Sequence, residues 1–171
     1  MDITQLIIDD HAEQRRLFAL IDEIDGSEPD ALKAVWTRLR VFLDTHALAE
    51  ERFFYPELLK IGRGADNESP VEETRDAIKD HNEIRDTAAN VDKQELGSPE
   101  WFQAVAAANK ANSDHMAEEE RQGLTDFRRH GGLPLRHRLG VEFARFEAEH
   151  LTGTGVKPVD RDVDEYVLEN S

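Results

Sequence analysis

The stretch that decides the fold runs from residue 29 to residue 54 and reads PDALKAVWTRLRVFLDTHALAEERFF. Its apolar residues recur at steps of three and four positions, which places them along one side of a helix. Pro29 suits the first turn of this helix, because the amide hydrogen that proline lacks is not needed there. We expect the helix to reach at least Phe54 and to kink or end near Pro56, because a proline inside a helix clashes with the preceding turn.

The same period continues on both sides of this stretch. Two openings, Ser69-Pro70-Val71-Glu72 and Ser98-Pro99-Glu100, combine a capping serine with a proline in the first turn and mark the starts of two further helices. Besides the helix above, the sequence predicts helices over residues 3–25, 71–96, 99–127 and 133–150. Because no strand-like alternation appears, the predicted class is all-α.

We expect an antiparallel, up-and-down four-helix bundle whose core ends near residue 127, followed by an additional C-terminal helix. Residues 1–151 would form this helical bundle and its additional helix as one domain, since 171 residues is near the size of a single domain. Residues 152–171 lack a sustained pattern and are expected to form a loosely packed acidic tail. In the alternative, four apolar residues dock this tail on the bundle: Val163, Tyr166, Val167 and Leu168.

Composition narrows the chemistry. The chain has no cysteine, which excludes disulfide scaffolds, thiolate zinc sites, iron–sulfur clusters and cysteine nucleophiles. Its formal net charge of −16 would repel phosphate backbones, so nucleic acid is not expected as a partner. The amino terminus lacks a basic region, and no apolar run approaches membrane-spanning length. We therefore expect a cytoplasmic protein without membrane contact, present as a monomer or weak homodimer.

Four of the seven histidines fall on the inward stripes of four successive predicted helices: His11, His46, His81 and His115. Their separations of 35, 35 and 34 residues match one helix plus one connection in an up-and-down bundle. Two of them have a glutamate four residues later, Glu50 after His46 and Glu119 after His115. Four residues are about one helical turn, so the imidazole and the carboxylate can reach the same point.

This constellation predicts a site for two metal ions, each taking two imidazoles. Glu50 and Glu119 would bridge the ions, and an oxide or hydroxide would close the pair. Nitrogen and oxygen ligands suit iron, zinc, copper and nickel, and the paired arrangement favours two iron ions. The competing interpretation makes each histidine a hydrogen-bonded core residue, but burying four imidazoles and two carboxylates without partners is strongly unfavourable. Glu120 is the alternative to Glu119, because both lie in one acidic run.

At these residues the sequence resembles the hemerythrin-like proteins, also called the HHE cation-binding family. The resemblance spans residues 1 to about 127, and its most specific stretch reads HALAEERFFYP at residues 46–56. It implies a non-haem di-iron centre in which the four histidines are terminal ligands and the two glutamates are bridges. Oxygen-carrying hemerythrins have a fifth histidine where this chain has Arg85, and an aspartate where it has Glu120.

The missing fifth histidine would leave one coordination position open to dioxygen, hydrogen peroxide or nitric oxide. We expect a di-iron protein that reacts with dioxygen or hydrogen peroxide, with catalase-like peroxide decomposition as the enzymatic form. One alternative is a module that binds oxygen, nitric oxide or iron reversibly without turnover, and another is a structural bundle with an adventitious site. Tyr55 is expected outside the ligand set, and surface or helix-end positions are expected for His130, His137 and His150.

Overall fold

The computed structural model describes residues 1–171, and its regular structure is entirely helical, which confirms the all-α class. Eight helices follow one another along the chain. They are α1 (Ile3–Glu23), α2 (Pro29–Phe53), α3 (Tyr55–Ile61), α4 (Pro70–Val91), α5 (Pro99–Arg121), α6 (Gly123–His130), α7 (Leu133–Glu149) and α8 (Val163–Asn170).

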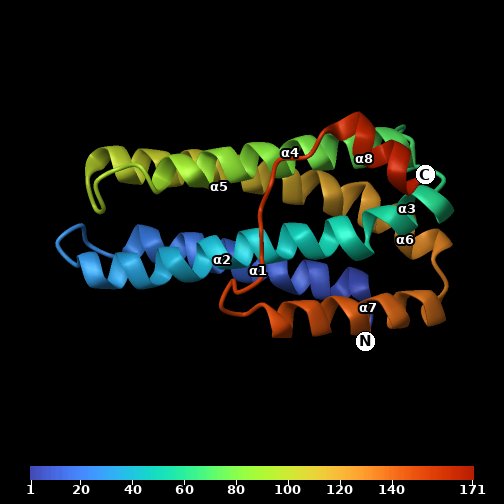
Figure 1. Cartoon of the computed structure of the whole chain (residues 1–171), viewed down its shortest axis with the longest axis horizontal. Coiled ribbons are helices and arrows are strands. Elements are labelled where there is room, and N and C mark those ends of the chain that lie inside the picture. The colour runs from blue at the N-terminus through green and yellow to red at the C-terminus, as the bar shows by residue number, and fades with distance from the viewer.

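Four long helices, α1, α2, α4 and α5, run along the longest axis of the molecule (Figure 1). α7 lies along α1 and α2, and the short helices α3, α6 and α8 gather at one end. Short connections join α1 to α2 and α4 to α5 at the opposite end, so the chain reverses direction there.

Capping side chains set the starts of three long helices. The Asp2 carboxylate accepts from the Thr4 amide at the start of α1, and Ser98 caps α5 by accepting from the Trp101 amide. Ser69 and Glu72 form a reciprocal capping box at the start of α4. The openings that the sequence predicted for α4 and α5 are therefore helix starts.

The fourth predicted helix is broken, contrary to the expectation of one helix through residue 127. α5 ends at Arg121, and α6 begins at Gly123. The Gly123 amide donates to Oε1 of Glu73 over 3.1 Å, and a Cβ at this glycine would lie 2.8 Å from the same oxygen. The break therefore lets the backbone approach a buried carboxylate of α4. Near Pro56 the expected break is also present, between α2 and α3.

Two apolar clusters form the core. One contains Phe54, Tyr55, Phe127 and Phe143, and the other contains Phe18, Trp36, Leu39 and Trp101. Along α1 the first cluster precedes His11 and the second follows it, and along α2 the order is reversed. The same alternation holds for α4, and for α5 continued into α6. The four histidines consequently share one level between the two clusters.

One part of the C-terminal tail packs on the bundle, as in the alternative that sequence analysis gave, whereas residues 157–162 are exposed. Helix α8 covers residues 163–170 and lies against α4 and α3. Tyr166 and Val167 are buried, whereas Leu168 is exposed. The Tyr166 hydroxyl donates a hydrogen bond to the backbone carbonyl of Glu51 on α2. Val163 also packs, partly buried, against the first apolar cluster, so three of the four candidate docking residues make the contact that sequence analysis had given as the alternative.

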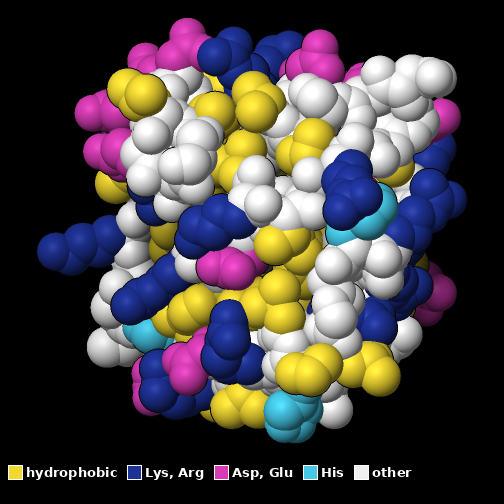
Figure 2. Space-filling model, turned by 90° about the vertical axis from the view of Figure 1, so that its right-hand side faces the viewer, with side chains coloured by type: hydrophobic (Ala, Val, Ile, Leu, Met, Phe, Trp, Pro, Cys, Tyr) yellow, Lys and Arg dark blue, Asp and Glu magenta, His cyan; other side chains and the backbone are white.

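Charge is unevenly distributed over this acidic chain. The stretch RRHGGLPLRHR, residues 128–138, covers the end of α6, the connection and the start of α7 without a single acidic residue, and Leu133 within it is exposed. Figure 2 shows the end of the molecule that carries this connection, where Lys and Arg side chains surround hydrophobic ones.

None of the helices combines the length and the apolar character needed to cross a lipid bilayer.

Candidate metal centre

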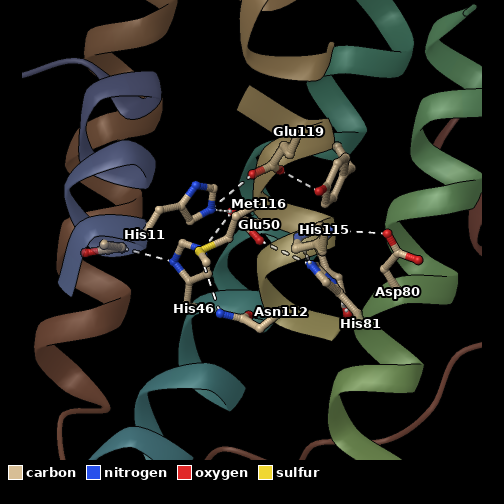
Figure 3. A network of polar contacts seen from close by, with 12 residues as sticks. His11, His46, Glu50, Asp80, His81, Asn112, His115, Met116 and Glu119 are labelled. Carbon is tan, nitrogen blue, oxygen red and sulfur yellow. Dashed lines mark hydrogen bonds and ion pairs between the residues drawn. The ribbon is translucent and has the colours of Figure 1, made fainter. Parts of the chain in front are cut away.

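The six side chains singled out in the sequence come together in the middle of the bundle (Figure 3). α1 provides His11, α2 provides His46 and Glu50, α4 provides His81, and α5 provides His115 and Glu119. None of the six is more than 4 % exposed. The three- and four-residue periodicity produces this meeting, because each side chain continues the apolar stripe of its own helix.

The histidines form two pairs, and Glu50 lies between them. The ring centroids of His11 and His46 are 5.2 Å apart, and those of His81 and His115 are 4.6 Å apart. Glu50 Oε1 lies 2.9 Å from Nε2 of His46, and Glu50 Oε2 lies 3.3 Å from Nε2 of His81. Two fully buried groups of possible ligands share Glu50, namely His11, His46 and Glu50, and Glu50, His81 and His115. A third, less buried group consists of Asp10, His46 and Glu147, and Glu119 belongs to none of the three.

Several polar atoms that face this centre have no hydrogen-bond partner in the protein. They are Nε2 of His11, Nε2 of His46, both carboxylate oxygens of Glu50 and Oε2 of Glu119. In the other pair, the Nε2 atoms of His81 and His115 face each other over 3.1 Å. Unpartnered buried polar groups are costly, and here they are the nitrogen and oxygen donors that metal cations take. The residues present therefore fit a bound metal.

Each histidine also has a carboxylate behind its ring, on the side away from the centre. Nδ1 lies 3.0 Å from a carboxylate oxygen of Glu120 for His11, of Asp10 for His46 and of Glu51 for His81. For His115 the partner is Asp80, at 3.6 Å. A carboxylate on the second ring nitrogen fixes the tautomer and the orientation of a metal-binding imidazole. Sequence analysis missed all four of these carboxylates.

The four carboxylates form a closed cycle around the bundle. Each carboxylate comes from a neighbouring long helix. A carboxylate of α1 contacts the histidine of α2, one of α2 contacts that of α4, one of α4 contacts that of α5, and one of α5 contacts that of α1. The sequence carries a signal for them. Asp-His occurs at residues 10–11 and 80–81, and Glu-Glu occurs at residues 50–51 and 119–120, so each supporting carboxylate is adjacent to a residue of the centre.

The charges inside this centre are strongly coupled. Burial alone would lower the pKa of His11, but the carboxylates of Glu119, Glu120 and Glu50 raise it to about 10. Burial is likewise outweighed at His46, whose pKa is raised well above its usual value, chiefly by Glu50. The pKa of Glu50 is held well below its usual value, against its burial, by the neighbouring histidines. Without metal, protons on imidazoles supply the positive charge, and a cation that binds here would displace them.

The two neighbouring glutamates of α5 point to different places. Glu119 turns toward the centre, with Oε2 3.3 Å from Nε2 of His11. Glu120 lies behind His11 and also accepts from Arg15 over 2.7 Å. The Tyr55 hydroxyl donates to Oε1 of Glu119 over 2.5 Å. Tyr55 thus contacts a residue of the centre but belongs to none of the ligand groups described above, and the turn of the chain between α2 and α3 places it there.

Arg85 occupies the sequence position of the absent fifth histidine, and its guanidinium is directed at Glu51 rather than at the centre. The three other candidate histidines also lie elsewhere. Nδ1 of His130 is 2.6 Å from Asp126, that of His137 is 3.2 Å from the Met1 carbonyl, and that of His150 is 2.6 Å from the Phe146 carbonyl. None of them joins the ligand groups described above.

A model of one protein family matches most of the chain. It is the hemerythrin HHE cation binding domain, and the match covers residues 2–124. The chain belongs to this family. The hemerythrin-like domain therefore includes all six residues of the centre and all four supporting carboxylates, while α7 and α8 lie beyond the matched residues. No curated protein and no solved structure gave a significant match.

Membership in a cation-binding family agrees with the His and Glu groups of the centre, which could each hold a metal ion. The hemerythrin-like domain supplies imidazole and carboxylate in both groups, and Glu50 is common to them. A shared carboxylate suits two adjacent cations, because each of its oxygens can face one ion.

Proposed function

We propose that the chain is a di-iron protein of hemerythrin type, built on an antiparallel, up-and-down four-helix bundle, which reacts with dioxygen or hydrogen peroxide. One iron ion would be held by His11 and His46 and the other by His81 and His115, with the carboxylates of Glu50 and Glu119 between them. Bound iron would supply the one-electron chemistry that dioxygen and peroxide require.

The observation that carries this proposal is the convergence of unpartnered donor atoms. Nε2 of two imidazoles and three carboxylate oxygens are buried in the centre without a hydrogen bond from the protein. In a bundle that used these residues only for packing, protonated imidazoles would have to balance the carboxylates through contacts that lack hydrogen-bond geometry, which is costly for buried polar groups. The cation-binding family of the chain supports the same assignment.

The protein itself orients the imidazoles. Hydrogen bonds of 3.0 Å at Nδ1 of His11, His46 and His81 leave Nε2 of each ring directed inward. Because each supporting carboxylate belongs to a neighbouring helix, the rings are fixed by the packing of the bundle rather than by local chain geometry. Ligands held in this way need little reorganisation when a cation binds.

Tyr55 would control the orientation of Glu119. Burial and the nearby charges of Glu119 and Glu50 raise the pKa of Tyr55 well above its usual value, so its hydroxyl stays protonated and donates. The hydrogen bond holds Oε1 of Glu119 and leaves Oε2 to face the centre. The two carboxylates would therefore differ, since no hydroxyl donates to Glu50, whose oxygens lie against Nε2 of His46 and His81.

The surroundings favour a very small reactant. A cavity of about 10 Å³ is lined by His115, Glu119 and Glu73, among other residues of α4 and α5. This volume is about the least that can hold one water molecule. Dioxygen, hydrogen peroxide and nitric oxide are small enough to approach such a centre after slight side-chain movement, whereas an organic substrate is not.

The same enclosure supports a second candidate function, namely a reversible binding module for oxygen, nitric oxide or iron. A deeply buried centre with apolar clusters on both sides protects a bound ligand from water and so suits binding without turnover. The two candidates use the same residues. They differ in whether added peroxide is consumed repeatedly or reacts once per centre.

The test is the metal content of purified protein, measured together with absorption spectra before and after addition of hydrogen peroxide. About two irons per chain, near-ultraviolet absorption of an iron pair and repeated oxygen release would support the enzymatic form. Two irons per chain, with one change of the absorption spectrum that is complete after one equivalent of peroxide per centre, would favour the binding module. Zinc alone, or less than one metal per chain in iron-replete medium, would overturn the di-iron proposal.

Matched variants sharpen this test. His81→Ala removes an imidazole of the centre, whereas His130→Ala removes an exposed histidine that bonds to Asp126. We expect His81→Ala to lose about one iron per chain and His130→Ala to keep two. Equal iron content in both variants would contradict the assignment of His81.

A further inference from the structure

Glu51, the carboxylate behind His81, is held from two sides. Its Oε1 atom lies 3.0 Å from Nδ1 of His81 and is also contacted by the guanidinium of Arg85 on α4. Its Oε2 atom is contacted by Nε of Arg161, from the segment before α8. The Glu51 side chain is fully buried, so these are the groups that fix its position.

Arg161 is itself fixed to the helix that carries His81. The segment between α7 and α8 crosses the bundle in Figure 1, and it ends on α4. The Asn82 side chain donates to the Arg161 carbonyl over 2.8 Å, and the Arg161 amide donates to Oδ1 of Asn82 over 3.0 Å. The guanidinium lies 5.6 Å from the ring centroid of Tyr166, which in turn bonds to the Glu51 carbonyl. Arg161 is therefore placed against Glu51 by backbone and side-chain bonds together.

The other half of the centre has no counterpart of this segment. Glu120, the carboxylate behind His11, keeps 32 % of its side chain exposed. Its arginine partner is Arg15, four residues after His11 as Arg85 is four residues after His81. The Arg15 side chain is 44 % exposed. His11 and Arg15 thus correspond to His81 and Arg85, 70 residues later in an internal repeat of the sequence, so each half has one arginine. The C-terminal segment adds a second arginine to the His81 half only.

We propose that Arg161 is a positioning residue which acts through Glu51 on His81 and makes the two metal subsites of the centre inequivalent. The proposal rests on the proposed di-metal function. A carboxylate that is held by two guanidinium groups keeps a fixed position behind the Nδ1 hydrogen of His81. The His81 ring is therefore held more firmly in its metal-binding orientation than the ring of His11, whose carboxylate has one arginine partner and is more exposed.

The first measurement needs no metal. In metal-free protein labelled with ¹⁵N at histidine, we expect the Nδ1 hydrogen of His81 to give a slowly exchanging proton resonance. Arg161→Gln should broaden this signal or shift it, while the signals of His11 and His46 stay unchanged. Arg161→Lys, which keeps the positive charge, should restore it in part.

The control separates positioning from general loosening of the C-terminal segment. Arg75 pairs with Asp164 of α8 over 2.7 Å and does not touch Glu51, so Arg75→Gln weakens the attachment of α8 without changing the carboxylate. We expect Arg75→Gln to leave the His81 signal as in the wild type. An unchanged His81 signal in Arg161→Gln, or the same change in Arg75→Gln, would overturn the proposal.

The second measurement is an anaerobic titration with Fe²⁺. Loss of a supporting contact behind a metal-binding histidine typically weakens affinity 10- to 100-fold. Because Arg161 acts through Glu51, we expect Arg161→Gln to weaken one of the two iron sites about 10-fold and to leave the other unchanged. Equal weakening at both sites would contradict inequivalent subsites. If the wild type takes up no iron, the di-metal function fails, while the metal-free measurement still decides whether Arg161 positions His81.

Discussion

The hydroxyl of Tyr55 donates a hydrogen bond to Oε1 of Glu119 over 2.5 Å, and both side chains are buried. Glu50 and Glu119 correspond to each other in the internal repeat, since each follows a histidine by four residues. Tyr55 follows Glu50 by five residues, whereas the residue five after Glu119 is Leu124. The only tyrosine of the pair therefore serves the carboxylate of the other copy. Two carboxylates that are equivalent in sequence are unequal in the folded protein.

Replacing Tyr55 by phenylalanine should destabilise the metal-free protein by about 1–3 kcal/mol, because an oxygen of Glu119 would be left buried without a donor. Urea unfolding followed by circular dichroism measures the difference. Tyr166→Phe is the matched control, since it removes a hydrogen bond to the neutral carbonyl of Glu51 instead. A smaller loss of stability in Tyr55→Phe than in Tyr166→Phe would show that the bond to Glu119 contributes little.

Glu50 and Glu120 should differ in what they do for metal binding. Glu50→Gln removes the carboxylate that belongs to both ligand groups, so iron content should fall from two per chain to less than one. Glu120→Gln alters only the support behind His11, so two irons should still bind, one of them 10- to 100-fold more weakly. Metal analysis and Fe²⁺ titration of the two variants distinguish these outcomes, and two tightly bound irons in Glu50→Gln would argue against a shared role.

Stability of the metal-free protein should depend on pH through Glu73. Burial, and then the charge of Glu119, raise the pKa of Glu73 from 4.5 to about 8. The folded state thus binds this proton more tightly than the unfolded chain. The resulting stabilisation is fully present below pH 4.5 and is lost as the pH rises to about 8.

Glu73→Gln keeps the uncharged form at every pH, so at about pH 9 it should be more stable than the wild type, by on the order of 3 kcal/mol. The difference should shrink toward pH 5. Urea unfolding at several pH values measures it, with Glu83→Gln on the exposed face of the same helix as the control. A pH-independent difference between Glu73→Gln and the wild type would mean that folding does not raise the pKa of Glu73.

Gly97 should resist substitution, although it is far from the centre. Its φ is +76°, and a Cβ there would lie 2.9 Å from the Gly26 carbonyl oxygen in the neighbouring loop. Gly97→Ala should therefore cost about 1–3 kcal/mol of unfolding free energy. Gly132→Ala is the control, since the nearest atom to its added Cβ would be 3.8 Å away. Thermal unfolding measures both, and equal midpoints would refute the strain at Gly97.

Much of the fold and the centre could be predicted because they depend on local periodicity. A spacing of three and four residues places side chains on one face of a helix whatever surrounds it. For this reason His46 and Glu50, and likewise His115 and Glu119, could be assigned to one face before any contact was known. The helix starts at Ser69 and Ser98 could also be predicted from the sequence, because capping involves residues only three positions apart.

Contacts between helices could not be predicted in this way. Asp10 is adjacent to His11 in the sequence but supports His46 on the next helix, and Glu120 is adjacent to Glu119 but supports His11. One residue turns a helix by about 100°, so neighbours along the chain face different partners. Which partner each one meets depends on how the helices are packed and rotated.

The sequence by itself determined an all-helical chain with one histidine on each of four successive helices and a glutamate one turn after two of them. Tertiary structure alone decided that Tyr55 bonds to Glu119, that Arg85 turns to Glu51 and that the C-terminal segment brings Arg161 to the same carboxylate. The physical reason is the range of the interactions. Helix periodicity and capping act over a few residues, whereas Arg161 and Glu51 are 110 residues apart and meet only when the packed helices place them together.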